Sequence, residues 1–457
     1  MRHKIQRIHF VGVGGAGMCG LAEVMHSLGY EVSGSDARHP PSLDGLRAAG
    51  IQVFAGGHDA AHVANADCVV YSGAVGEDNP ERMAATARGV PVIPRAQMLG
   101  EVLRFKPGVA VAGTHGKTTV SSMLAAILSA AGQDPTCIIG GRFLDGGGNA
   151  RIGGGEFVVA EADESDASFL HLQPVAAVVT NIDNDHLAAF GGDMARLQEA
   201  FYNFLGNLPF YGTAVVCADD PRAAELADSV SFVRVVRYGI GENVDVRATD
   251  ICADNGGMRF TLRFDDGDFP ACLPAAGLHN VCNAAGAAAM ARELGASADA
   301  VVAGLSEFRG VGRRLERRDD VVINGGQAIL IDDYAHHPTE IDATVAAVRG
   351  AHAGRKLILV FQPHRYTRTR DLFSRLTKSL AAGDELVLLD VYPAGEKPIA
   401  NADSDALAAA LGNGTVRAKS LPSAAEAVRK MVGDGDVILT MGAGDIGSLP
   451  EILEKPA

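Results

Sequence analysis

The sequence predicts an α/β protein built from three domains, and three observations lead to this. Short apolar runs of strand length alternate with segments of helical periodicity along the 457 residues, which is the order that builds parallel sheets. Two of the expected strands run directly into glycine-rich turns. The length also suggests about three domains, because a domain commonly holds roughly 100–200 residues.

A glycine-rich turn near the N-terminus predicts a nucleotide-binding domain of the Rossmann type. The apolar residues 8–11 lead into Gly-Val-Gly-Gly-Ala-Gly at 12–17, and a helical pattern follows. The second expected strand, residues 31–36, ends in an acid that is placed to contact a ribose hydroxyl. NAD and a UDP-sugar each carry a pyrophosphate that these amides suit, so the motif leaves the nucleotide open. The candidate residues are Gly12, Gly14, Gly15, Ala16, Gly17 and Asp36.

The strongest functional motif is Gly-Thr-His-Gly-Lys-Thr-Thr at residues 113–119. It lies between an expected strand, residues 109–112, and an expected helix, residues 120–131, which is the setting of a phosphate-binding loop. Unpaired amides and the helix dipole favour phosphate there, although the loop is shorter than usual. A lysine adds positive charge and a threonine offers a hydroxyl to Mg²⁺. The candidate ATP-binding residues are Gly113, Thr114, His115, Gly116, Lys117, Thr118 and Thr119.

Two further expected strands of the central domain end in possible metal ligands. Residues 156–161 end at Glu161, and residues 175–180 lead into an acidic segment that ends at His186. Ligands gather at the carboxyl ends of parallel strands, so both side chains become candidates for Mg²⁺. A solvated acid and a capping histidine are the ordinary alternatives.

The later part of the central domain differs in pattern. Residues 231–238, 244–251 and 258–264 alternate like strands and predict an antiparallel extension of the sheet. A helix then begins after Gly277, where Asn280 either contacts a bound base or caps the helix.

The last third of the chain predicts another α/β domain with a basic site. Its expected strands are residues 328–331, 356–361, 385–389 and 436–440. The histidine pair 336 and 337 follows the first strand, and it favours metal binding only weakly because adjacent side chains rarely converge on one ion. Arg365 and Arg368 follow the second strand. Their spacing of three places them on one helix face, where two guanidinium groups suit a carboxylate or a phosphate.

Composition narrows the classes of function. A net charge of −15 argues against general binding to nucleic acid or to acidic membranes. The seven cysteines never form a C-x-x-C pair, which indicates reduced thiols rather than a disulfide scaffold or a structural zinc site. No apolar run reaches the ~18 residues of a membrane span, and no export signal is evident. We therefore expect a cytoplasmic protein.

Taken together, the motifs resemble the Mur peptide ligases of bacterial cell-wall synthesis. The resemblance covers nearly the whole chain and rests on residues 9–18, 113–119, 160–166, 332–340 and 361–370. It implies an ATP-dependent ligase that phosphorylates the lactyl carboxylate of UDP-N-acetylmuramate. The amine of L-alanine would then attack the acyl phosphate and release phosphate. Such an enzyme serves peptidoglycan synthesis, and with it cell shape and division.

The resemblance also implies a role for each candidate residue. It places Lys117 at the β- and γ-phosphates of ATP. The Mg²⁺ ligands would be Thr118 and Glu161, with His186 at a second ion. Further contacts to ATP would come from Asn280 and Arg314. The groups that place alanine or stabilise the acyl phosphate would be His336, Arg365 and Arg368. The N-terminal glycines would hold the UDP pyrophosphate, with Ser72 and His115 near the sugar nucleotide.

One feature departs from several branches of that family. Those branches use a carbamylated lysine shortly after the metal-binding histidine, whereas no lysine occurs here between Lys117 and Lys356. The sequence therefore does not indicate which residue completes the second metal site. We predict domains at residues 1–106 for the UDP-sugar, 107–318 for ATP in a P-loop ATPase-like fold, and 319–457 for the amino acid in a second Rossmann-like fold.

Three other functions remain as alternatives. A related ligase that adds a preformed tripeptide to UDP-N-acetylmuramate would share every motif. An NAD-dependent oxidoreductase would account for residues 12–17 and Asp36 but leaves residues 113–119 unexplained. A nucleotide-sensing regulator would bind without turnover. The expected partners are UDP-N-acetylmuramate and L-alanine, with no nucleic acid and no membrane, in a monomer or weak homodimer.

Overall fold

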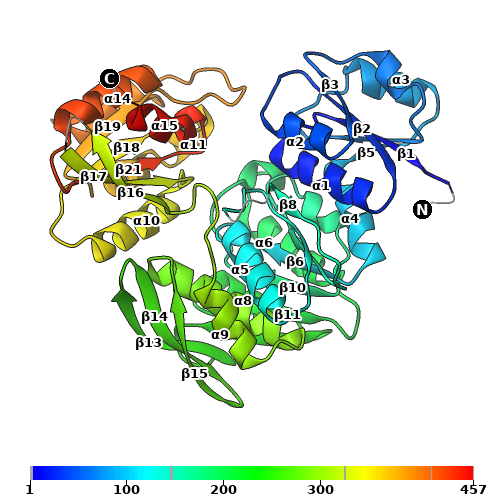
Figure 1. Cartoon of the computed structure of the whole chain (residues 1–457), viewed down its shortest axis with the longest axis horizontal. Coiled ribbons are helices and arrows are strands. Elements are labelled where there is room, and N and C mark those ends of the chain that lie inside the picture. Colours follow the sequence, from blue (N-terminus) through cyan, green and yellow to red (C-terminus); the bar gives the residue numbers. More distant parts are fainter. Residues whose placement is uncertain (1–3, 145–147, 324–325, 413, 456–457) are drawn as a thin grey trace. The chain divides into compact units, whose positions relative to one another are not determined.

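The computed structural model describes residues 4–144, 148–323, 326–412 and 414–455, which form three β-sheets with helices on both faces (Figure 1). These residues divide into two compact units, which are described separately. The first unit holds Met1–Thr249, Thr261–Ala271 and Cys282–Arg309, and the second holds Asp250–Phe260, Cys272–Val281 and Gly310–Ala457. Among the described residues, no helix has both the length and the apolar character to cross a membrane.

The N-terminal sheet is fully parallel, with strand order β3-β2-β1-β4-β5. Its strands are β1 (Arg7–Val11), β2 (Glu31–Asp36), β3 (Gln52–Ala55), β4 (Cys68–Tyr71) and β5 (Val92–Pro94). Its helices are α1 (Ala16–Ser27), α2 (Ser42–Ala48), η1 (Ala60–Val63), α3 (Pro80–Ala87) and α4 (Arg95–Phe105). The order reverses at β1, and ligands of such sheets bind where the order reverses. The glycine turn at residues 12–17 follows this strand, as the sequence predicts.

The central sheet has ten strands in the order β15-β14-β13-β12-β11-β10-β6-β9-β7-β8. The strands are β6 (Gly108–Ala112), β7 (Thr136–Ile138), β8 (Ala150–Arg151), β9 (Val158–Glu161), β10 (Ala176–Val179), β11 (Thr213–Cys217), β12 (Arg234–Gly239), β13 (Val246–Asp254), β14 (Gly257–Phe264) and β15 (Gly267–Leu273). Strand β6 is wholly buried and pairs in parallel with β9 and β10, so the segments that follow these three strands leave the same edge of the sheet.

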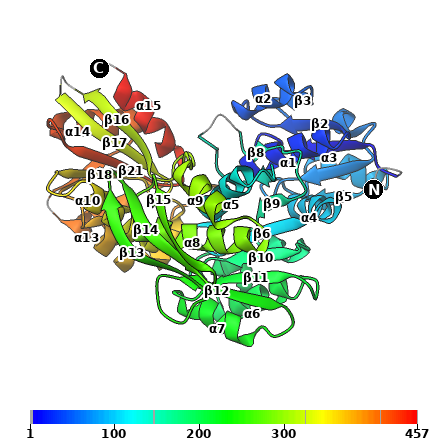
Figure 2. The same cartoon turned by 60° about the horizontal axis from the view of Figure 1, so that its bottom comes forward.

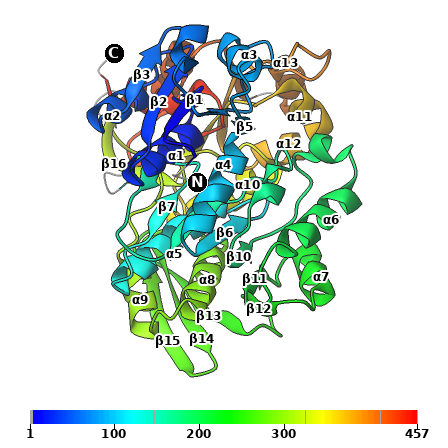
Figure 3. The same cartoon turned by 90° about the vertical axis from the view of Figure 1, so that its right-hand side faces the viewer.

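Helices cover both faces of this sheet. They are α5 (Lys117–Ala130), η2 (Ser168–His171), η3 (Leu187–Phe190), α6 (Met194–Leu205), α7 (Pro221–Ser229), α8 (Leu278–Glu293) and α9 (Ala298–Ser306). Figures 2 and 3 show α5 and α9 together on one face of the sheet, and α6 and α7 on the other. The fully buried, valine-rich and alanine-rich strands β6 and β10 reflect this double cover.

The predicted antiparallel extension is correct for β13 and β14 and wrong for β12, and the structure adds β15, which was not predicted. Strand β12 pairs in parallel with β11 and, over two residue pairs, with β13. Sequence alternation does not reveal strand direction, because both sheet types give the same period of two. The link between β13 and β14 is Asn255-Gly256, with φ +47° and +83°. Positive φ at both positions is typical of a tight antiparallel hairpin.

The C-terminal sheet has the order β16-β17-β21-β18-β19-β20, and β16 runs antiparallel to β17. Its strands are β16 (Glu316–Ile323), β17 (Gly326–Asp333), β18 (Leu357–Phe361), β19 (Glu385–Leu389), β20 (Thr415–Ala418) and β21 (Val437–Met441). Its helices are α10 (Pro338–Ala351), α11 (Tyr366–Asp371), α12 (Phe373–Leu380), α13 (Ser404–Leu411), α14 (Leu421–Met431), η4 (Asp445–Ser448) and α15 (Leu449–Glu454). The predicted central domain ends at residue 318, which lies inside strand β16. The predicted domain boundaries therefore remain a prediction.

Two apolar layers hold this last sheet. Buried residues of α10, α12 and α13 pack on one face, and buried residues of α14 and α15 pack on the other. This packing extends to the last residues of β18 and β21, Phe361 and Met441, and loops begin beyond it. The histidines and arginines that the sequence analysis selected follow β17 and β18 there.

Candidate active site

The loop that follows β6 has the backbone of a phosphate-binding turn. Gly113 has φ +129°, and a side chain at this position would collide with Thr180. Gly116 has φ +85° and precedes α5, whose first residue is Lys117. No side chain caps the start of this fourteen-residue helix. Its first amides are therefore left for a ligand, as the sequence predicts.

Lys117 is partly buried and lies beside the fully buried carboxylate of Glu164. Its Nζ donates to Glu164 Oε2 at 2.7 Å and to the carbonyl oxygen of Gly113 at 2.5 Å. Burial by itself lowers the pKa of Lys117, but Glu164 and Asp163 raise it, and the balance holds the pKa above its usual value. The other oxygen of Glu164, Oε1, is buried and has no hydrogen-bond partner among the described residues. This lysine is charged and held in place before any phosphate arrives.

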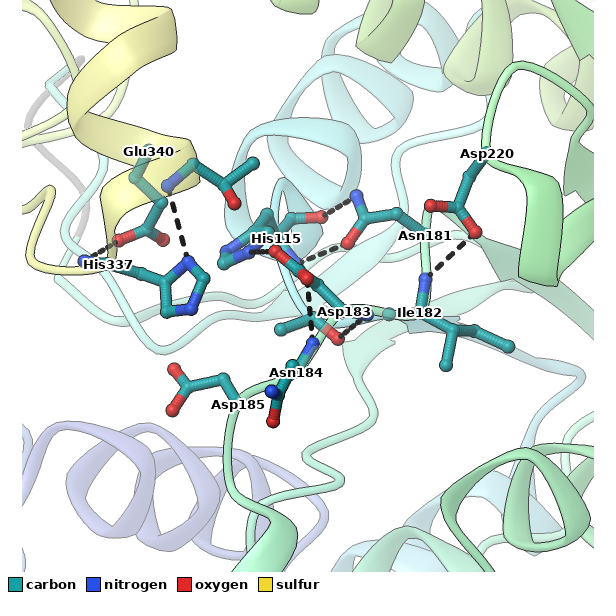
Figure 4. A network of polar contacts seen from close by, with 12 residues as sticks. His115, Asn181, Ile182, Asp183, Asn184, Asp185, Asp220, His337 and Glu340 are labelled. Carbon is teal, nitrogen blue, oxygen red and sulfur yellow. Dashed lines mark hydrogen bonds and ion pairs between the residues drawn. The ribbon is translucent and has the colours of Figure 1, made fainter. Parts of the chain in front are cut away.

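His115 is fixed by the segment that follows β10 (Figure 4). Its amide donates to Asn181 Oδ1 at 2.8 Å, and its Nε2 lies 3.1 Å from Asp183 Oδ2. The amide of Asp183 in turn donates to Thr114 Oγ1 at 2.9 Å. The amide of Ile182 donates to the carboxylate of Asp220, which caps α7. These contacts tie the phosphate loop to its neighbouring strands, so its shape does not depend on a ligand.

The first pair of predicted Mg²⁺ ligands lies on this same sheet edge. Thr118 is in the first turn of α5, and Glu161 is the last residue of β9, where it accepts a hydrogen bond from the amide of Gly140 at 2.8 Å. A hydroxyl and a carboxylate are the oxygen donors that Mg²⁺ prefers, so this pair fits the ion.

The third predicted ligand, His186, lies beyond the end of β10. It has φ +57° and its ring pairs with Asp185 at 3.5 Å. The residue precedes η3 without forming a side-chain cap, so the capping alternative does not describe it.

The N-terminal glycine turn is held by Asp36 and packs closely against its neighbours. The amide of Gly14 donates to Asp36 Oδ2 at 2.9 Å. Gly12 has φ +79°, and a side chain there would come within 3.1 Å of Ser72 Cβ. A side chain at Gly17 would meet the guanidinium of Arg95 at 3.0 Å. Close packing therefore requires small residues here, and Asp36 is part of the turn itself.

In the second unit, Asn280 and Arg314 belong to different elements. Asn280 is buried in the first turn of α8 and donates to the carbonyl oxygen of Ala276 at 2.8 Å. The guanidinium of Arg314 lies over the ring of Tyr334 at 5.2 Å and 3.9 Å from Glu340 Oε1. The asparagine side chain thus binds the segment just before the helix.

A basic cluster follows β17 and β18 in the second unit. The rings of His336 and His364 lie 5.8 Å apart, and Arg368 Nη1 lies 3.2 Å from His364 Nδ1. Burial, with repulsion from His336 and Arg368, lowers the pKa of His364 to about 3. His364 is therefore neutral at pH 7, and the arginines carry the charge of this cluster.

Arg365 corrects one detail of the prediction. It does not lie on a helical turn with Arg368: it precedes α11 and has φ +69°, ψ +137°. A residue with a Cβ is strained in this region, and such strain concentrates at functional sites. Its side chain is exposed. His337, by contrast, is a structural residue, because its Nδ1 accepts from the amide of Thr339 in a capping box with Glu340 (Figure 4).

The sequence analysis missed four residues that shape these sites: Glu164, Asn181, Asp183 and His364. Each lies inside a segment that the analysis had already selected. These residues stand out in the structure because of the residues that they contact, which come from other segments of the chain. Spacing along the chain cannot reveal such partners.

Comparison with known proteins identifies the family. Three family models match: "Mur ligase family, catalytic domain" over residues 7–107, "Mur ligase middle domain" over 111–291 and "Mur ligase, glutamate ligase domain" over 313–444. The UDP-N-acetylmuramate–L-alanine ligase of Burkholderia multivorans is 53% identical over 456 residues, which cover 98% of each chain. The chain belongs to the Mur ligase family.

Relatives and solved structures extend this comparison. The UDP-N-acetylmuramate–L-alanine ligase of Chromobacterium violaceum is 51% identical to this Mur ligase, again over 98% of each chain. The structure of a UDP-N-acetylmuramate-alanine ligase from Thermotoga maritima superposes with a TM-score of 0.82 at 30% identity, covering 98% of both chains. A murein peptide ligase from Psychrobacter arcticus gives 0.74 at 27% identity, with 98% of both chains covered. The predicted three-domain α/β class is confirmed.

Proposed function

We propose that this Mur ligase joins L-alanine to the lactyl carboxylate of UDP-N-acetylmuramate at the expense of ATP, in peptidoglycan precursor synthesis. The observation that carries the proposal is the 53% identity with a UDP-N-acetylmuramate–L-alanine ligase over 98% of both chains. Because its substrates are ATP and a nucleotide-linked sugar, we place the reaction in the cytoplasm. A monomer or weak homodimer, acting without nucleic acid or membrane, remains part of the proposal.

The chemistry follows from the weakness of a free carboxylate as an acyl donor. The lactyl carboxylate attacks the γ-phosphorus of ATP, and ADP leaves. The alanine amine, in its uncharged form, then attacks the acyl carbon; its nitrogen loses a proton to solvent, and phosphate departs with the electron pair of the C–O bond. Charge on the transferred phosphoryl group must be neutralised, and Lys117 supplies a fixed positive charge for this. ATP phosphates would compete with Glu164 for that lysine.

The oxygen donors Thr118 and Glu161 would hold Mg²⁺, with His186 at a second ion. Bound there, Mg²⁺ would supply positive charge against the phosphates of ATP. A thermal shift by Mg²⁺ and an ATP analogue that disappears in Glu161→Gln would support this assignment, and an unchanged shift would refute it. No lysine follows His186 before Lys356, so a carbamylated lysine shortly after His186 does not complete the site of the second ion.

We assign the alanine carboxylate to the basic cluster of the second unit, formed by His336, His364, Arg365 and Arg368. Paired guanidinium groups match a carboxylate well, and the neutral His364 can accept or donate one hydrogen bond without adding charge. Asn280 and Arg314 would contact ATP. The N-terminal turn, with Asp36 and Ser72, would take the UDP-sugar, and His115 would lie near the sugar nucleotide.

The decisive experiment is phosphate release with UDP-N-acetylmuramate, ATP and a panel of amino acids and peptides. We expect turnover with L-alanine and little with a tripeptide. The tripeptide alternative has its own support, since murein peptide ligases share the fold at 27% identity. Turnover with a tripeptide but not with alanine would therefore overturn the proposal. Tight binding of NADH would instead favour the alternative that the protein is an NAD-dependent oxidoreductase.

A further inference from the structure

Two cysteines that are 65 positions apart in sequence meet at the carboxyl end of β11. Cys217 is the last residue of β11, and Cys282 lies in α8. Their sulfur atoms are 3.6 Å apart. Asp219 Oδ2 lies 3.7 Å from the Cys282 sulfur. One ligand atom from each of the three side chains lies within 4.8 Å of the other two. Neither the sequence analysis nor the proposed reaction uses this cluster.

These separations agree with a tetrahedral zinc site. With Zn–S bonds of about 2.3 Å, two sulfur ligands of one tetrahedral ion lie about 3.8 Å apart. A sulfur and a carboxylate oxygen lie about 3.5 Å apart by the same geometry. The observed 3.6 and 3.7 Å differ from these values by only a few tenths of an ångström. Cys282 is thus already spaced from Cys217 and from Asp219 as a ligand of one shared ion would be.

The neighbourhood holds the three ligands in place. Asp219 accepts from the amides of Ile240 at 2.7 Å and Gly241 at 2.9 Å, which orients its carboxylate. The buried side chain of Tyr238 interacts with Cys217. Partners of this kind orient metal ligands in proteins. Cys217 is buried whereas Asp219 is exposed, so an ion can enter from solvent and keep a water as its fourth ligand.

We propose that Cys217, Asp219 and Cys282 form a binding site for a thiophilic divalent cation of the Zn²⁺ class. On binding, the two thiol protons pass to solvent as two metal–sulfur bonds form, so the site is distinct in chemistry from the Mg²⁺ ligands. The ion would cross-link the end of β11 to α8. The next residue of that helix, Asn283, lies against Gly116, where a side chain would come within 2.7 Å of Asn283 Oδ1. The cross-link would therefore reach the start of the phosphate loop helix.

The test uses the reduced, chelator-treated full-length protein without substrates, so its outcome is independent of the proposed reaction. Cd²⁺ serves as the probe, because cadmium thiolates absorb in the ultraviolet, and Zn²⁺ then competes for the site. We expect one equivalent of Cd²⁺ with a two-thiolate band that excess Mg²⁺ does not remove. Losing an outer partner of a metal ligand costs 10–100-fold in affinity, so Cys282→Ser should cost at least about 100-fold.

The matched control is Cys252→Ser, which removes an exposed thiol elsewhere in the chain and should leave binding unchanged. A second measurement needs no variant: Zn²⁺ should slow maleimide labelling of Cys217 and Cys282, mapped by mass spectrometry, and leave Cys252 reactive. Equal Cd²⁺ affinity in Cys282→Ser, or labelling of both thiols at an unchanged rate, would overturn the proposal.

Discussion

Lys117 carries two roles that can be separated experimentally. It neutralises the buried carboxylate of Glu164 in the structure, and in the proposed reaction it contacts ATP phosphates. Removing one partner of a buried ion pair leaves the other charge uncompensated and destabilises the fold. Activity loss in a lysine variant could therefore arise from folding or from catalysis.

We predict that Lys117→Ala lowers phosphate release at least about 100-fold, because removal of one preorganised charge-stabilising donor typically costs 10²–10³ in rate. Binding of UDP-N-acetylmuramate, measured by calorimetry, should stay intact. The control is the double variant Lys117→Ala/Glu164→Gln, which should regain folding stability without regaining turnover. Turnover that returns with stability would show the lysine to be structural only.

Arg365 should act on alanine more than on the UDP-sugar. Loss of a charged hydrogen bond costs about 1.5–3 kcal/mol, so Arg365→Ala should raise the KM for L-alanine by about tenfold or more in steady-state assays. Arg370→Ala is the matched control, because Arg370 is exposed on α11, the short helix that begins directly after Arg365, and pairs with Asp371 at 2.7 Å. Equal effects of both substitutions, or an effect confined to the UDP-sugar, would contradict this assignment.

His364 predicts a pH dependence of stability. Its pKa is about 3 in the folded chain against an ordinary value of 6.5, so between these values the unfolded chain binds more protons. This residue's contribution to stability is thus present at pH 7 and is lost as the pH falls through that window. Burial raises the pKa of Asp333 to about 6, so protonation of Asp333 favours the folded state as the pH falls. This effect opposes that of His364, so the test compares a His364 variant with the wild type.

Denaturant unfolding at pH 7 and pH 5 measures the effect of His364. For each protein, the free energy of unfolding at pH 5 is compared with its own value at pH 7. We expect this change in pH to favour the folded state more in His364→Gln than in the wild type. The same pH dependence in both proteins would mean that this histidine does not titrate as the structure implies.

The element that matters most is the unit of β6, the phosphate loop and α5. Glycines with positive φ stand at both ends of α5, Gly116 before it and Gly132 after it, and Gly113 ends the strand. Their surroundings differ. A side chain at Gly132 would meet nothing within 4 Å, whereas one at Gly113 would collide with Thr180. The loop is therefore set by packing against the neighbouring strand as well as by backbone freedom.

This contrast gives a matched pair of variants. Gly132→Ala should cost about 1–3 kcal/mol of unfolding free energy, the usual cost of a non-glycine residue with positive φ. Gly113→Ala should cost more and should also abolish ATP binding, measured by calorimetry, because Thr180 anchors the loop through the carbonyl of His115. If the two substitutions cost the same free energy of unfolding and Gly113→Ala still binds ATP, the close approach of Gly113 to Thr180 is unimportant.

The whole molecule consists of two compact units, each with its own core, and the predicted functional residues are distributed over both. Chains with several domains commonly unfold in more than one step. A ligand that binds one unit stabilises that unit alone, by an amount set by its concentration and affinity.

We therefore predict two transitions in differential scanning calorimetry. UDP-N-acetylmuramate should raise the transition of the first unit, which carries the N-terminal turn, and leave the other in place. Gly113→Ala should lower the same transition and so identifies it. A single transition that shifts with both would show that the units unfold together.

The sequence by itself determined the α/β class, most strands and the segments that carry function. Strands at 31–36 and 385–389 occupy the predicted residues. The second of these is a short apolar run bounded by polar residues. The phosphate loop was predictable because its glycines, lysine and flanking elements are all local in the chain.

Only the tertiary structure decided which side chains meet. The pairing of Lys117 with Glu164, the anchoring of His115 by Asp183, and the contact of Cys217 with Cys282 join residues 47 to 68 positions apart. The parallel direction of β12 and the strained backbone of Arg365 were equally hidden. Each depends on the order and direction of the strands in the folded sheet. The local pattern of residues does not determine that order.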